Sequence, residues 1–213
     1  MAVLLAPVCA ACRAPLEHPT AGAVCASCWS AVTPTTPLGC EPLPPLISLV
    51  TAIGPYDGRL RDVIHALKYD PRPTIARRLA LRMRDAGAGV LAGADVAVPV
   101  PLHRSRQRRR GFNQARALAL HLGLPLADAL VRARKTESQA DLPAERRSTN
   151  VRGAFSLHPR AVVEDRVVVL VDDVRTTGAT LNACAAVLLE AGAAEVRALT
   201  AARATLKADR SPR

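Results

Sequence analysis

The chain has 213 residues, a hydrophobic fraction of 49%, a formal net charge of +11 and a pI near 10.4. This length suits one α/β domain of ordinary size with a small appendage, and the apolar fraction is sufficient for a core. Because aromatic residues make up only 2% of the chain, base stacking has few platforms, so any contact with nucleic acid would be mainly ionic. The positive charge suits a substrate with several phosphates as well as it suits a nucleic acid.

The N-terminal residues show no sign of export. No stretch approaches the roughly 18 apolar residues of a membrane span. Met1–Cys9 is too short for a lipoprotein signal, and Pro7 and Val8 stand where small residues would be needed. We therefore expect a cytoplasmic protein without membrane contact.

Five of the six cysteines lie in the first forty residues. Four of them form two C-x-x-C pairs separated by twelve residues, which is the spacing of a four-thiolate zinc site. The role would be structural, because four thiolates leave no open position and so short a segment needs the metal to fold. A redox pair or incidental thiols are the alternatives. The predicted ligands are Cys9, Cys12, Cys25 and Cys28, and Cys40 stays unassigned.

A proline-rich connector, Glu41–Leu46, marks a predicted domain boundary. Ile47–Ile53 follows as a predicted strand, and Ile75–Met83 is predicted to be a helix. Between them, Lys68 stands at the end of another predicted helix, where it would complement the helix dipole or contact a phosphate. The buried face of that helix is predicted from apolar residues at i, i+3, i+4 and i+7, namely Leu60, Val63, Ile64 and Leu67.

The next predicted strand, Asp95–Pro101, opens into a strongly basic loop. Five of the seven residues from Arg104 to Arg110 are arginine. For the part from Arg106 onward, three interpretations stay open: contact with a substrate phosphate, a solvated face, or a nucleic-acid patch. A further helix is expected after Gly111, with Asn113 as its cap.

The sequence then turns polar from Leu130 to Phe155. Such a stretch inside a compact domain is more often a functional lid than slack, although a solvated, disordered loop is a serious alternative. The polar candidates for closing a lid are Arg134, Gln139, Arg146, Arg147 and Asn150.

The strongest site signal is V-V-V-L-V-D-D-V-R-T-T-G-A-T, from Val167 to Thr180. Five apolar, mostly β-branched residues predict a buried parallel strand that stops at Asp172 and Asp173, so both carboxylates lie at the carboxyl edge of a sheet. The hydroxyl- and glycine-rich turn is followed by a predicted helix, Leu181–Ala191, whose positive end faces the turn. Two acids beside a phosphate cradle suit a sugar with one phosphate, whereas the plain alternative is a polar exit loop.

This stretch resembles the phosphoribosyl pyrophosphate (PRPP) signature of type I phosphoribosyltransferases. The resemblance implies that Asp172 and Asp173 bind the ribose 2′ and 3′ hydroxyls, that the turn binds the 5′-phosphate, and that magnesium accompanies PRPP. It also implies that the P-V-P-L-H element binds pyrophosphate through His103 and Arg104, a role for which bidentate arginine donors are well suited. A lid would then keep water from an electron-poor ribosyl cation. The turn residues are Thr176, Thr177, Gly178, Ala179 and Thr180.

Motifs along nearly the whole chain resemble those of the ComF (ComFC/GntX) family. They are the cysteine pairs, Y-D-G-R-L-R-D-V-I-H-A-L-K-Y from Tyr56, R-G-F-N-Q from Arg110, Q-A-D-L-P-A-E-R-R from Gln139 and N-V-R-G-A-F from Asn150. The resemblance implies a phosphoribosyltransferase-like protein with an N-terminal zinc finger, associated with DNA uptake and natural transformation. The chain departs from the family at Cys40, where relatives usually carry another C-x-x-C pair; this affects a second metal site and not the first.

We therefore expect an α/β fold with a type I phosphoribosyltransferase-like parallel sheet flanked by helices, preceded by a small four-cysteine zinc module. The expected units are residues 1–45 for the module and linker, 46–205 for the phosphoribosyltransferase-like domain and 206–213 for a polar tail. Three functions compete. The first is transfer of phosphoribosyl from PRPP to an acceptor that the motifs do not specify. The second is PRPP or nucleotide sensing without turnover, and the third is handling of single-stranded DNA together with competence or recombination proteins.

Overall fold

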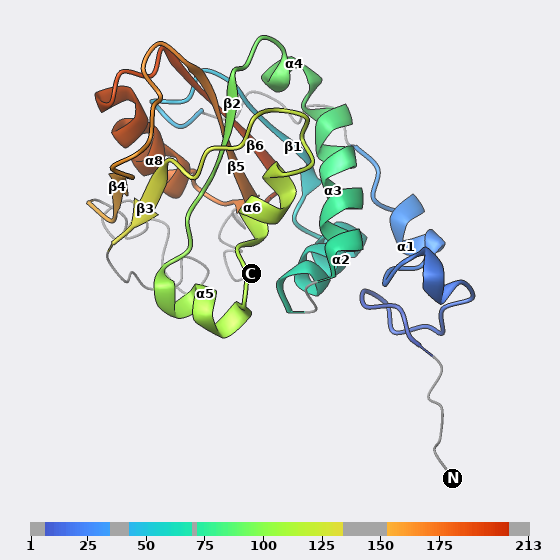
Figure 1. Ribbon diagram of the computed structural model, residues 1–213. Coiled ribbons are helices and arrows are strands. Elements are labelled where there is room, and N and C mark those ends of the chain that lie inside the picture. Colours follow the sequence, from blue (N-terminus) through green and yellow to red (C-terminus); the bar gives the residue numbers. More distant parts are fainter. Residues whose placement is uncertain (1–6, 35–42, 70–71, 134–152, 205–213) are drawn as a thin grey trace, which may run out of the picture.

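The computed structural model describes residues 7–34, 43–69, 72–133 and 153–204 (Figure 1). Its centre is a four-stranded parallel sheet in the order β1-β6-β5-β2, and a two-stranded antiparallel ribbon is formed by β3 and β4. Parallel neighbours need crossover connections, and the helices between successive strands supply them. The strands are β1 (Val50–Pro55), β2 (Val96–Pro99), β3 (Leu130–Arg132), β4 (Phe155–Leu157), β5 (Val167–Arg175) and β6 (Glu195–Arg203).

Helices cover both faces of the central sheet, as predicted. One face packs against α2, α3 and α6, and the other packs against α8 and the β3–β4 ribbon. The sheet is therefore buried on both sides, which explains the unbroken apolar run of β5. The helices are η1 (Pro19–Ala21), α1 (Ala26–Ser30), α2 (Gly58–Tyr69), α3 (Pro73–Ala86), α4 (Ala88–Leu91), α5 (Arg104–Arg110), α6 (Gln114–Ala119) and α8 (Ala179–Glu190).

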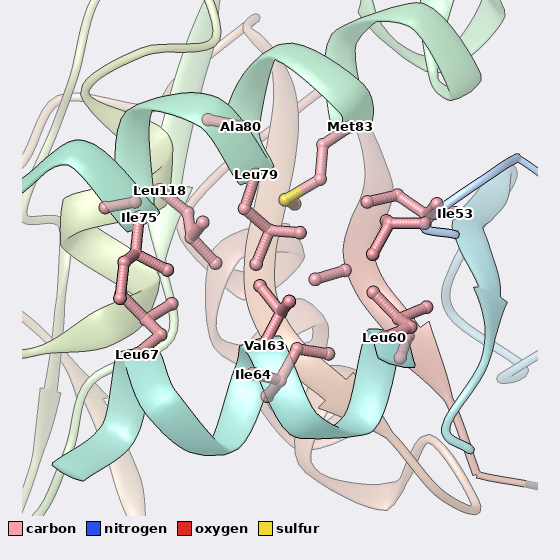
Figure 2. Packing of buried hydrophobic residues seen from close by; sticks show 14 of the residues in the cluster. Ile53, Leu60, Val63, Ile64, Leu67, Ile75, Leu79, Ala80, Met83 and Leu118 are labelled. Carbon is pink, nitrogen blue, oxygen red and sulfur yellow. The ribbon is translucent and has the colours of Figure 1, made fainter. Parts of the chain in front are cut away.

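The predicted apolar faces of the helices are confirmed. Figure 2 shows the side chains of α2 interleaved with those of α3 and with Ile53 and Leu118. On α8, the buried residues are again those at helical spacing. The fully or nearly fully buried residues of these faces are Leu60, Val63, Ile64, Leu67, Ile75, Leu79, Met83, Leu181, Cys184 and Leu188.

Two strand boundaries differ from the sequence prediction. β5 does not stop at the acidic pair but continues to Arg175, because β6 pairs with it along this whole length. On its other side β2 ends at Pro99, opposite Val171, so the acidic residues lie on β5 beyond the end of β2. β1 begins at Val50 and not at Ile47, whose N–H donates to the carbonyl of Pro44 in a turn.

The basic stretch after β2 is a helix and not a loop. α5 covers all five arginines, with the His103 side chain accepting from the Ser105 N–H at its start and Gly111 at φ 79° at its end. Arginine is a good helix former, so two capped ends are enough to define a short helix. The predicted cap of the next helix is confirmed, because the Asn113 side chain accepts from the Ala115 N–H at 3.0 Å.

The cysteine-containing segment packs directly on the first helix layer. Trp29 and Val32 belong to the same buried cluster as Ile53. Arg82 of α3 donates to the carbonyls of Val32 and Trp29 at 2.9 and 3.3 Å, and the Arg78 guanidinium lies 5.1 Å from the centre of the Trp29 ring. Among the described residues, no helix combines the length and apolar character needed to cross a membrane.

Candidate functional site

The acidic pair lies at the carboxyl edge of the central sheet, and its two side chains point to opposite faces. Asp173 faces the α2 and α6 layer, where its Oδ2 accepts from Lys68 Nζ at 2.8 Å and from Gln114 Nε2 at 3.3 Å. Its Oδ1 accepts from the Val174 N–H at 2.8 Å. With only 6% of its surface exposed, Asp173 is a buried carboxylate held from three directions.

Asp172 lies in a different environment. It is partly exposed, its Oδ1 accepts from the Asp173 N–H at 2.8 Å, and its charge acts on Cys184 of α8 and on Arg132 of β3. Burial raises the pKa of Asp172 well above its ordinary value of 3.8, and the adjacent Asp173 raises it further, while Lys68 opposes the shift. Asp172 is therefore the carboxylate that gains most from hydrogen-bond donors supplied by a ligand.

The turn predicted to hold a phosphate joins β5 to α8. Gly178 is the N-cap of α8 and adopts φ 80°, which an L side chain rarely adopts. Thr177 Oγ1 accepts from the Ala179 N–H at 3.4 Å. Because α8 is a twelve-residue helix, its first N–H groups and its positive dipole end lie next to this turn.

The connector that precedes β1 packs against the same turn. A Cβ placed on Gly178 would lie 2.6 Å from Cγ of Pro44, which is too close for any real contact. Two residues further on, the N–H of Leu46 donates to Asn182 Oδ1 at 3.0 Å. The glycine thus allows both the turn conformation and the close approach of the connector.

The predicted pyrophosphate residues, His103 and Arg104, lie at the beginning of α5. His103 Nδ1 contacts Ser105 Oγ at 2.8 Å and Arg104 is exposed. In Figure 1, α5 lies below the sheet and is joined to the end of β2 by a short segment. This position is the expected one for a loop or helix that follows β2.

A buried arginine joins this edge from the ribbon. Arg132 is 6% exposed and its guanidinium lies 5.1 Å from the centre of the Phe155 ring. Burial lowers its pKa, and the positive charge of Arg106 lowers it further, while Cys184 and Asp172 act in the opposite direction. Arg106 of α5, Arg132 and Asp172 therefore share one electrostatic environment.

The structure brings together the acidic pair and the turn, but it does not describe the predicted lid. Arg134, Gln139, Arg146, Arg147 and Asn150 lie outside the described residues, as does Cys40.

The four predicted metal ligands form one cluster. The Sγ atoms of Cys9, Cys12, Cys25 and Cys28 all lie within 4.8 Å of one another. Cys9 and Cys28 are 4.0 Å apart, and Cys12 and Cys25 are 3.7 Å apart. A tetrahedral ion with Zn–S bonds of about 2.3 Å requires sulfur atoms about 3.8 Å apart, so the cluster fits a zinc ion. The Ser27 hydroxyl lowers the pKa of Cys25 to about 6, which favours the thiolate.

Comparison with known proteins finds a family match in the second half of the chain. The model of the phosphoribosyl transferase domain matches residues 108–211, which include β5, the acidic pair and the turn. Just under half of the chain therefore resembles a phosphoribosyl transferase domain. This agrees with the predicted fold class, which the parallel sheet with helices on both faces confirms.

Curated relatives match a shorter stretch. The DNA utilization protein YhgH of Escherichia coli (strain K12) is 42% identical over 71 residues, which are 33% of this chain and 30% of that protein. The same protein of Shigella flexneri matches equally. Together with the phosphoribosyl transferase domain match and the cysteine cluster, this partial likeness supports the expected resemblance to ComF-like proteins of phosphoribosyltransferase fold.

Solved structures with detectable similarity include enzymes of purine metabolism. One is described as the allosteric regulatory enzyme of purine biosynthesis and is 27% identical to this chain. The aligned region covers 66% of this chain and 30% of the chain of that enzyme, with a TM-score of 0.41. The glutamine PRPP amidotransferase of B. subtilis, also 27% identical, covers 65% and 30% of the two chains with a TM-score of 0.40. At these scores the fold assignment rests on the sheet topology and on the matched domain.

Two residues of the candidate site have a partner that was not predicted. Lys68 was expected to complement the helix dipole or to contact a phosphate, and Gln114 was given no role, but both contact Asp173. The sequence did carry a signal for both. Lys68 stands eight residues after Leu60 and four after Ile64, and Gln114 stands four residues before Leu118. Each polar residue therefore lies on the core-facing side of its helix. A buried polar residue needs a partner, and Asp173 supplies it for both.

Proposed function

We propose that this protein binds PRPP at the carboxyl edge of the sheet and transfers its phosphoribosyl group to an acceptor. The observation that supports this most strongly is the position of the acidic pair on β5, past the end of β2, followed at once by a glycine turn at the start of α8. Carboxylates accept from sugar hydroxyls, and N–H groups at a helix start bind a phosphate. One edge thus offers complementary groups to both parts of a ribose 5-phosphate.

The basic residues at this edge suit the leaving group. Arg106 and Arg132 share the electrostatic environment of Asp172, and arginine binds phosphate oxygens through two parallel donors. Such donors would stabilise the charge that develops on pyrophosphate as the bond to C1 of the ribose breaks. Magnesium would enter with PRPP on oxygen ligands and would neutralise part of the pyrophosphate charge.

PRPP-dependent release of pyrophosphate, measured across a panel of nucleobases and amines, tests this function. Release with one acceptor supports a transferase and identifies the second substrate. PRPP binding without release for any acceptor would support the sensing alternative, and absence of binding would contradict both.

We further propose a structural zinc ion on the four cysteines of the N-terminal segment. The cluster geometry fits four thiolate ligands, and Trp29 and Val32 connect it to the core around Ile53. Elemental analysis should find one zinc per chain, and Cys25→Ser should lower this content. Full retention of zinc in the variant would contradict the assignment.

A second candidate function, binding of single-stranded nucleic acid, is favoured by one observation. Tyr69 is 63% exposed, and the Arg110 guanidinium lies 5.7 Å from the centre of its ring. The centre of the His65 ring lies 4.6 Å from the centre of the Tyr69 ring. An exposed aromatic ring beside a basic helix is a platform on which a base can stack.

The helical form of α5 divides its arginines between the two candidate functions. Arg106 and Arg110 are partly buried, whereas Arg104, Arg108 and Arg109 are exposed. Neutralising Arg108 and Arg109 should spare PRPP binding and should reduce the salt slope of single-stranded DNA affinity by about 1.4, at roughly 0.7 per lost contact. An unchanged slope would assign α5 to the substrate alone.

A further inference from the structure

Asp173 is bound by two groups that belong to different helices of one layer. Lys68 of α2 and Gln114 of α6 both donate to Oδ2, at 2.8 and 3.3 Å. The orientation of the Gln114 amide follows from chemistry, because an ionised carboxylate only accepts and the amide must present its nitrogen. Gln114 is 3% exposed and Asp173 is 6% exposed, so neither group exchanges these contacts for water at low cost.

Lys68 also has little freedom to serve another ligand. Its side chain is 17% exposed, and its Nζ lies 5.8 Å from the centre of the Tyr56 ring. Burial on its own would lower the pKa of Lys68, but the charge and the hydrogen bond of Asp173, together with the charges of Tyr56 and Asp172, outweigh burial and the pKa is raised. The lysine therefore stays charged and remains directed at Asp173.

The acidic pair needs a cation in this position. Two adjacent carboxylates disfavour each other's ionisation, and a buried carboxylate without a partner is strongly destabilising. On the opposite face of β5, Asp172 interacts electrostatically with Arg132 and Cys184, and also with the adjacent Asp173. On the α2 and α6 face, the cation that contacts Asp173 is Lys68.

We propose that Lys68, assisted by Gln114, is a positioning residue of the PRPP site that fixes the orientation of the Asp173 carboxylate. Asp172 is then the carboxylate that faces the sugar, and Lys68 acts on the ligand only through Asp173. This division of the pair rests on the proposed function. It adds a residue from α2, outside the matched domain at residues 108–211, to the machinery of the site.

A double-mutant cycle measured by titration calorimetry with magnesium and PRPP tests this role. In the wild-type background, Lys68→Met should weaken binding by about tenfold or more, because Asp173 loses its charged partner. In the Asp173→Asn background the same change should cost no more than about twofold, because nothing remains for Lys68 to position. Where Lys68→Met folds poorly, Lys68→Arg, which keeps the charge, and the double variant, which carries no uncompensated charge, can still be compared with the wild type and with Asp173→Asn.

Two further variants separate positioning from a general effect. Lys68→Arg keeps the charge and should recover most of the affinity, and Arg61→Met removes a cation from the exposed side of the same helix and should leave affinity unchanged. Equal losses for Lys68→Met in both backgrounds would overturn the proposal, since Lys68 would then act independently of Asp173. Absence of PRPP binding by the wild type would instead overturn the proposed function, and the role of Lys68 with it.

Discussion

Asp172 illustrates how a single residue can oppose stability while serving binding. Because burial and Asp173 raise its pKa, the folded protein holds this proton more tightly than the unfolded chain does. The contribution of Asp172 to stability therefore falls as the pH rises from its ordinary pKa of 3.8 through the raised value. Above the ordinary pKa of 3.8, Asp172 therefore destabilises the ligand-free fold.

Replacing this carboxylate by an amide should stabilise the ligand-free protein. We expect Asp172→Asn to raise the melting temperature at pH 7 by on the order of 2–4 °C for each kcal/mol relieved, and to weaken PRPP binding. The gap to the wild type should widen as the pH is raised from about 4, as thermal unfolding across a pH series will measure. A variant that melts below the wild type at neutral pH would contradict the assigned burial cost.

At the same scale, the sequence predicted the acidic pair but not that its two side chains face opposite sides of the sheet. The strand was expected to stop at Asp172 and Asp173, whereas it continues through them and sends consecutive side chains to opposite faces. The strand length depends on pairing with β6, which is a tertiary contact. No local pattern around the pair could have supplied it.

Among the elements, the turn before α8 offers a matched pair of glycines. Gly178 and Gly111 adopt φ 80° and 79°, but an added Cβ meets Pro44 at 2.6 Å in the first case and nothing within 4 Å in the second. Gly111→Ala should therefore cost about 1 kcal/mol from backbone strain alone. Gly178→Ala should cost about 2–3 kcal/mol, since overpacking adds to the strain.

Chemical denaturation of both variants measures this difference, and the connector provides the control. Gly178→Ala combined with Pro44→Ala should recover most of the free energy of unfolding that Gly178→Ala loses beyond Gly111→Ala, because the clashing ring is removed. Equal costs at the two glycines would show that the connector does not press on the turn.

Other elements show where sequence patterns were sufficient and where they were not. The buried faces of α2 and α8 were predicted from the spacing of apolar residues, because burial alone determines which residues face the core. α5 was mistaken for a loop because its five arginines carry no apolar stripe, and it buries no residue. Its caps, His103 and Gly111, were the local signals that could have identified a helix.

In the whole molecule, the N-terminal segment is coupled to the main core. The sequence separated the two at a proline-rich connector, but it could not show that Arg82 and Arg78 of α3 hold Trp29 in place. Removing the metal should therefore expose Trp29, the single tryptophan of the chain, which is 2% exposed. Its fluorescence should shift to the red, and the melting temperature should fall by at least about 5 °C. Unchanged emission after verified metal removal would show that packing alone holds the segment.

The central claim, that the β5 edge and the following turn form a PRPP site, is tested most directly by titration calorimetry with magnesium and PRPP. The wild type should bind one PRPP per chain. Replacing both Asp172 and Asp173 by asparagine should cost at least about 3 kcal/mol, because the charge-assisted acceptor that faces the sugar and the charge of its neighbour are lost together. Equal affinity in the wild type and the double variant would contradict the account, because the acidic pair would then not contact the ribose.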